Sequence, residues 1–157
     1  MEAYFIKHVF LADDDEDDRD VFRDVIYNII PSAKVEVVND GETLLHLLSH
    51  MIPDILFLDL EMPGKNGLQC LLAIRGNEKL KDIPIVVFSS TTRPANVQTA
   101  YDMGADLFLT KKSSFQEYTK CLETVLKMNW NDKAVIKKQF NKHGGLPFSY
   151  EMIEGLK

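Results

Sequence analysis

Five short apolar runs recur along the chain and alternate with longer amphipathic segments. The runs have the length of buried strands and cover residues 8–12, 35–38, 55–58, 85–88 and 107–109. The segments between and after them carry apolar residues at helical spacing and cover residues 18–30, 44–48, 67–75, 94–103 and about 114–126. Strands that are apolar on both faces and joined by helices form parallel sheets covered on both sides. With right-handed crossovers, the pattern predicts a doubly wound α/β sandwich of five strand–helix units.

The helical spacing also predicts which side chains face the core. These are Val21, Phe22, Val25, Ile26 and Ile29 in the first helix, Leu68, Leu71, Leu72 and Ile74 in the third, and Phe115, Tyr118, Leu122, Val125 and Leu126 in the last. Pro31 should stop the first helix, and Gly104 should end the fourth.

The pattern of strand–helix units stops before residue 130. We therefore predict one domain over residues 1–129 and a C-terminal extension over residues 130–157. Within the extension, Asp132 can cap a helix to about Lys142, with Val135, Ile136 and Phe140 on one side, followed by Gly144-Gly145 and an extended stretch at 146–148. This segment either packs back on the domain or docks a partner. It is too short for an independent DNA-binding domain, since cores this small rarely fold alone.

Composition narrows the class of protein. The chain has 157 residues, of which 45% are apolar, as expected for one globular domain. No apolar run approaches the roughly 20 residues of a membrane span, and the N-terminus lacks the pattern of a signal peptide. Cys70 and Cys121 lie among apolar helical residues, which is typical of buried thiols in a reducing compartment, so we expect a cytoplasmic location. The basic residues form no patch for nucleic acid.

The net charge is concentrated at one place. The formal charge is −6, and the first 20 residues hold eight acidic and two basic side chains, while the rest of the chain is balanced. Most of the excess belongs to the acidic run Asp13–Asp18, directly after the first strand. A local concentration of this kind needs its own explanation, whereas an acidic balance spread over a whole chain usually affects only solubility.

Polar residues follow four of the five predicted strands. They are Asp13 and Asp14, Asp59, Ser89 and Lys111. The carboxyl ends of parallel strands form one edge of the sheet, where ligands of such folds bind. Crowded carboxylates repel each other unless a cation intervenes, and oxygen ligands favour Mg²⁺. With a lysine and a serine nearby, the site is suited to stabilising a phosphoryl group on a carboxylate. Asp17, Asp18 and Asp20 are interpreted as solvated charge at a helix start.

Four motifs resemble the receiver domain of two-component response regulators, of the single-domain chemotaxis type. They are VFLADDD at 9–15, DILFLDLEMPG at 54–64 followed by Asn66-Gly67, IPIVVFSS at 83–90 and GADLFLTK at 104–111. The resemblance covers about residues 5–129. It implies a flavodoxin-like fold with sheet order 2-1-3-4-5 and a chain that acts as a signalling switch rather than as an enzyme.

The resemblance also implies roles for particular residues. Asp59 would accept a phosphoryl group from a histidine kinase or phosphotransfer protein. Asp14 and Asp59 would ligate Mg²⁺ together with the backbone carbonyl of Glu61, and Asp13 would act mainly through a bound water. Lys111 would pair with the phosphoryl group.

The same family uses a hydroxyl and an aromatic residue as a switch. Here Ser89 would hydrogen-bond the phosphoryl group and be drawn inward, and the Phe108 side chain would follow Ser89. The surface formed by the fourth helix, fifth strand and fifth helix would then change its affinity for a downstream protein target. Phe108 stands where tyrosine is common. Lys112 replaces a proline that usually follows the lysine through a cis bond. A cis bond before a non-proline residue costs about 2.5–4 kcal/mol, so we expect this bond to be trans.

Other classes of site fit less well. Alternating acids from Asp13 resemble an EF-hand loop, but Asp18 stands where that loop needs glycine and Asp24 where it needs glutamate. A flavin carrier would need a phosphate-cradling loop, which the acidic run opposes. A phosphatase of the haloacid dehalogenase type needs a second aspartate two residues after the first, where this chain has Glu61. The histidines are scattered along the chain with no spacing typical of a phosphorelay, so a histidine phosphotransfer role is not supported; they are His8, His46, His50 and His143. The alternative that stays open is a Mg²⁺-dependent phosphotransfer or phosphatase enzyme acting on a small phosphorylated substrate.

Overall fold

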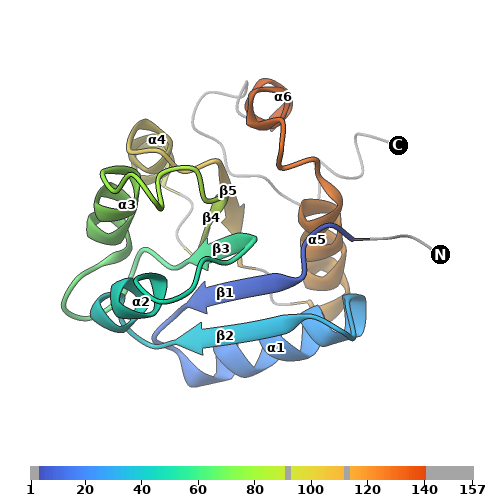
Figure 1. The fold of residues 1–157 in the computed structure, drawn as a ribbon. Helices are drawn as coiled ribbons and strands as arrows, with labels where there is room; N and C mark the ends of the chain where they lie inside the picture. Colours follow the sequence, from blue (N-terminus) through green and yellow to red (C-terminus); the bar gives the residue numbers. More distant parts are fainter. Residues whose placement is uncertain (1–3, 91–92, 112–113, 141–157) are drawn as a thin grey trace.

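The computed structural model describes residues 4–90, 93–111 and 114–140. Its strands are β1 (His8–Ala12), β2 (Lys34–Val38), β3 (Ile55–Leu58), β4 (Ile85–Ser89) and β5 (Leu107–Thr110). Its helices are α1 (Glu16–Ile29), α2 (Gly41–Leu48), α3 (Gly67–Arg75), α4 (Pro94–Asp102), α5 (Phe115–Lys127) and α6 (Lys133–Phe140). The strands form one parallel sheet in the order β2-β1-β3-β4-β5 (Figure 1), which confirms the predicted flavodoxin-like sandwich.

The sheet separates two apolar cores because side chains alternate across each strand. In β1, Val9 and Leu11 pack with Phe22 of α1 and with α5, whereas Phe10 and Ala12 face the core covered by α2, α3 and α4. The central strands β1, β3 and β4 are buried on both faces, as their apolar sequences predicted.

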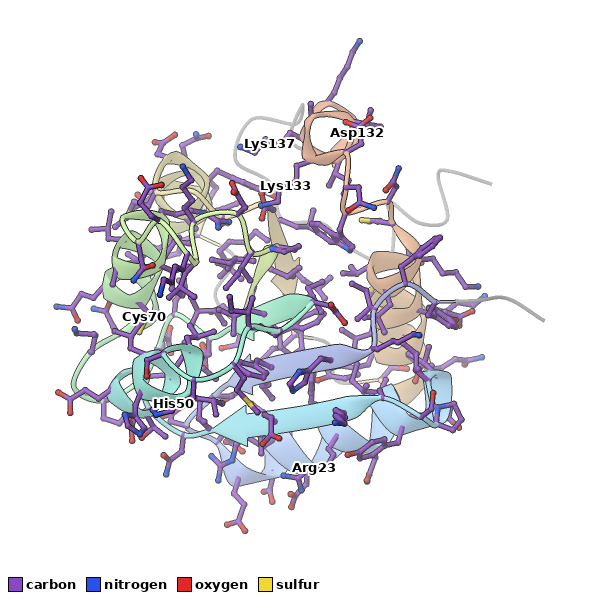
Figure 2. All side chains as sticks on the ribbon, in the orientation of Figure 1. Arg23, His50, Cys70, Asp132, Lys133 and Lys137 are labelled. Carbon is purple, nitrogen blue, oxygen red and sulfur yellow. The ribbon has the colours of Figure 1, made fainter. Side chains whose placement is uncertain are left out.

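Three predicted core positions are wrong. Val21 is 41% exposed, Leu72 is 55% exposed and Phe115 is 56% exposed. Each lies on an amphipathic helix that buries only one stripe of side chains against the sheet. In α3, that stripe includes Cys70 (labelled in Figure 2), and excludes Leu72; Cys70 is fully buried.

The described part of the C-terminal extension packs against the core on the α1–α5 side. Trp130 and Ile136 are buried in that core, and the Trp130 indole Nε1 donates to the Val125 carbonyl at 2.9 Å. Val135 was predicted on the same side of the helix as Ile136, but it is 55% exposed and does not share the burial of Ile136. The remainder of the extension, with Gly144-Gly145 and 146–148, lies outside the described residues.

A buried carboxylate anchors α6. Asp106, just before β5, accepts hydrogen bonds from the Ile85 amide and from Arg75 Nη2, both at 2.9 Å. Lys133 of α6, which Figure 2 labels, places its Nζ 3.3 Å from the same carboxylate and donates to the Ile83 carbonyl. Helix α6 is therefore tied to the amino ends of β4 and β5, away from the carboxyl edge where the acidic residues gather.

Within the described part of the chain, none of the helices has the length and apolar character needed to cross a bilayer.

Candidate functional site

Sheet pairing continues one residue past several strands and so aligns the polar residues that follow them. The Asp59 amide donates to the Ala12 carbonyl at 2.9 Å, and the Lys111 amide donates to the Ser89 carbonyl at 2.9 Å. Asp13 follows Ala12 directly. Asp13 and Asp59 thus start from neighbouring backbone positions at the carboxyl edge of the sheet, and Lys111 starts from the same edge beside Ser89, two strands further along.

Three carboxylates meet at this edge. Asp13 is fully buried, Asp59 is 4% exposed and Asp14 is exposed, and each has a carboxylate oxygen within 4.8 Å of those of the other two. Carboxylates held this close repel one another unless a cation lies among them. A set of oxygen ligands with one side open to solvent fits a hard divalent cation that keeps several waters.

The loop after β3 holds the Asp59 carboxylate in place. The Glu61 amide donates to Asp59 Oδ1 at 3.1 Å. The loop then returns to α3, where Asn66 and Gln69 form a capping box. A side chain at Gly67 would overlap the Asp59 carbonyl oxygen, so only glycine allows α3 to begin this close to the site.

One ammonium group bridges the acidic residues. Lys111 Nζ lies 2.7 Å from Asp13 Oδ2, 2.9 Å from Asp18 Oδ2 and 3.3 Å from Asp59 Oδ2. The lysine side chain is 15% exposed. The site therefore places a positively charged hydrogen-bond donor beside the same carboxylates that could hold a metal ion.

Burial and neighbouring opposite charges shift the pKa values of Asp59 and Lys111 in opposite directions. Burial raises the pKa of Asp59 to about 6, although the Glu61 amide and the Lys111 ammonium both lower it. Burial alone would lower the pKa of Lys111, but its close contacts with the Asp13 and Asp18 carboxylates raise it above its ordinary value. At neutral pH the lysine is thus fully charged, and Asp59 is ionised in most molecules.

Asp18 was predicted to be a solvated charge at a helix start, and it does lie in the first turn of α1 with a side chain that is 43% exposed, but its ion pair with Lys111 was not predicted. Helix α1 begins at Glu16, with Asp15 as its N-cap, two residues earlier than the apolar spacing indicated. Asp18 then lies one turn before the buried Phe22, on the face of α1 that meets the sheet. That spacing is a signal that sequence reasoning could have used.

The two predicted switch residues are both buried. Ser89 is fully buried at the end of β4, and so is Phe108 in β5. The Phe108 amide donates to the hydroxyl oxygen of Tyr101 in α4 at 3.0 Å, a contact that no sequence motif had indicated. Lys112 lies outside the described residues, so the trans bond before it stays a prediction.

A parallel sheet of this order, with acidic residues and a lysine at its carboxyl edge, defines the class of doubly wound α/β domains whose ligands bind at that edge. Residues 9–123 match the response regulator receiver domain family, and the chain belongs to that family. The prediction of a two-component response regulator receiver is therefore confirmed, and the comparisons support it over the enzyme alternative.

Known relatives differ in how much of their length this chain spans. It is 30% identical over 153 residues to the glycerol metabolism activator of Pseudomonas putida, covering 89% of this chain and 67% of that protein. It is 36% identical over 110 residues to the nitrate/nitrite response regulator protein NarL of Escherichia coli K12, covering 68% of this chain and 50% of NarL. The chain thus spans half the length of NarL. The Mn²⁺-bound form of response regulator Rcp1 has the same fold, with a TM-score of 0.70 at 23% identity, covering 78% of this chain and 96% of Rcp1.

Proposed function

We propose that Asp59 is the phosphoacceptor of this receiver. The phosphoryl donor would be a histidine kinase or phosphotransfer protein, and the output would be contact with a downstream protein. The observation that carries the proposal is the position of Asp59, buried at the end of β3, beside two further carboxylates and 3.3 Å from an ammonium group. The two cysteines of the chain are free thiols, in keeping with a cytoplasmic location.

We assign a Mg²⁺ ion to the acidic cluster. Asp14 and Asp59 would bind it directly together with the Glu61 carbonyl, and Asp13 would bind it mainly through a water. The donor set supports this assignment because it consists of oxygen atoms alone, and a Mn²⁺-bound form of the similarly folded Rcp1 supports a divalent cation. When bound, the ion neutralises phosphoryl oxygens as charge develops on them.

The chemistry assigned to Asp59 is nucleophilic. An ionised Asp59 oxygen attacks phosphorus, an O–P bond forms, the N–P bond to the donor histidine breaks, and the released imidazole nitrogen takes up a proton. The Lys111 ammonium and the Ser89 hydroxyl donate hydrogen bonds to the transferred group and so stabilise its charge. Because Asp59 must be ionised to attack, its pKa of about 6 leaves it reactive at neutral pH.

The phosphoryl group would bias a packed switch. Ser89 and Phe108 lie on adjacent strands, β4 and β5, so a shift of Ser89 toward the phosphoryl group opens space for Phe108 to follow. Phe108 is bonded through its amide to Tyr101 of α4, so movement there is transmitted to the surface of α4, β5 and α5. This surface is the proposed contact for the downstream target.

Intact-mass measurement with an acyl phosphate donor and Mg²⁺ tests the proposal. The natural chain should gain one adduct of roughly 80 Da, the mass of a phosphoryl group. Asp59→Asn should gain none, and Asp17→Asn, altered at an exposed acid nearby, should behave like the natural chain. A persistent adduct on Asp59→Asn would overturn the assignment. Repeated turnover of a small phosphorylated substrate, in place of a stoichiometric adduct, would favour the enzyme alternative.

A further inference from the structure

Asp18 stands apart from the other carboxylates that hold Lys111. Asp13 and Asp59 lie at the sheet edge and belong to the proposed metal and phosphoryl chemistry. Asp18 comes from the first turn of α1, and its Oδ2 lies 2.9 Å from Lys111 Nζ, across 93 residues of sequence. The proposed chemistry gives Asp18 no part in binding metal or accepting phosphate.

The resting Lys111 ammonium group donates hydrogen bonds to Asp18 and Asp59 and forms an ion pair with Asp13. An ammonium group has three N–H donors, and here three carboxylates lie within 3.3 Å of it. The distances to Asp13 and Asp18 are shorter than the distance to Asp59, so the lysine is drawn toward the α1 side. A phosphoryl group on Asp59 would accept a hydrogen bond from the same ammonium group, and so would compete with the carboxylates that already hold it, Asp18 among them.

We propose that Asp18 is a positioning residue that holds Lys111 in its resting place and competes with the phosphoryl group for it. This inference rests on the proposed function of Asp59. Once a divalent cation takes up the charge of Asp13 and Asp59, Asp18 is the contact that still draws the lysine away from the acceptor. Asp18 thus opposes the phosphorylated state and sets how readily the domain enters it.

The expected effect is modest because the Asp18 side chain is 43% exposed. Ion pairs this accessible to water contribute little, so releasing Lys111 should favour the phosphorylated state by about twofold to fivefold. The nearly isosteric change Asp18→Asn removes the charge without creating a cavity. Asp18→Ser serves as a second variant with the same expectation.

Beryllium fluoride with saturating Mg²⁺, a mimic of the phosphoryl group, tests the proposal by calorimetric titration of the whole chain. Asp18→Asn should bind it about twofold to fivefold more tightly than the natural chain. Asp17→Asn removes the same charge from the same helical turn and should change affinity much less. Asp18→Glu restores the charge and should return affinity toward that of the natural chain.

The possible outcomes distinguish a failure of this inference about Asp18 from a failure of the proposed function of Asp59. If the natural chain does not bind beryllium fluoride, the proposed function of Asp59 fails. If the natural chain binds it but Asp18→Asn matches Asp17→Asn, the role of Asp18 fails while that of Asp59 stands. Weaker binding by Asp18→Asn would also overturn the inference, because Asp18 would then be supporting the phosphoryl contact of Lys111.

Discussion

Replacing Asp59 with asparagine should stabilise the metal-free protein at neutral pH. The Asp59 carboxylate is 4% exposed, and burial raises its pKa from 3.8 to about 6. A raised pKa means that the folded chain binds this proton more tightly than the unfolded chain does. The folded state is therefore favoured at low pH, loses stability as the pH rises from about 4 to 6, and carries the full cost of the ionised group above that range.

The magnitude follows from the two pKa values. Their difference, at about 1.4 kcal/mol per pH unit, corresponds to about 3 kcal/mol of instability at pH 7.5. Asp59→Asn removes the charge, and so should raise the free energy of unfolding by up to about 3 kcal/mol at that pH. At pH 4.5 the natural side chain is largely protonated, so the gain should shrink to about 1 kcal/mol.

Urea unfolding in the presence of a chelator measures this effect. The chain has one tryptophan, Trp130, which is buried and reports unfolding by its fluorescence. Asp17→Asn is the matched control, since exposed substitutions usually change stability by less than about 0.5 kcal/mol. An Asp59→Asn variant no more stable than the natural chain at pH 7.5, or equally stabilised at both pH values, would refute the reasoning about burial.

Three further predictions concern other contacts. Asp14→Ala should weaken Mg²⁺ binding far more than Asp17→Ala in a titration, and equal losses would show that the metal has been assigned to the wrong carboxylates. Ile136→Ala should lower the free energy of unfolding by about 2–4 kcal/mol, because Ile136 is 4% exposed in the core; a change below about 0.5 kcal/mol would mean that α6 adds nothing to the fold. Tyr101→Phe should cost about 1–3 kcal/mol, since it leaves the buried Phe108 amide without its acceptor, and urea unfolding would reveal a smaller loss if water replaces the hydroxyl.

Periodicity was enough to predict the strands and the edge where polar residues meet. The central strands are apolar on both faces, and few folds bury such strands other than a parallel sheet with helices on both sides. Because parallel strands end at one edge, the positions of Asp13, Asp59 and Lys111 directly after strands were enough to predict that they converge. The residue that follows each strand was therefore enough to predict a site whose members lie far apart in the sequence, because the parallel topology brings them to one edge.

Contacts between elements could not be predicted in this way. The pairing of Asp18 with Lys111 depends on where α1 starts and on how it rotates against the sheet. The bond between Tyr101 and the Phe108 amide depends on the placement of α4 on β5. Leu72 is apolar yet exposed, since packing selects one stripe of α3 and leaves the rest to solvent.

The docking of α6 affects where this domain can be cut or joined to another protein. The family match ends at residue 123, inside α5, which continues to Lys127 and is followed by the buried Trp130 and Ile136. A chain shortened at the family boundary would lose the buried Val125, Leu126, Trp130 and Ile136 and the tie between Lys133 and Asp106. A hybrid regulator made from this receiver should therefore keep the chain through Phe140 and attach its effector beyond that residue.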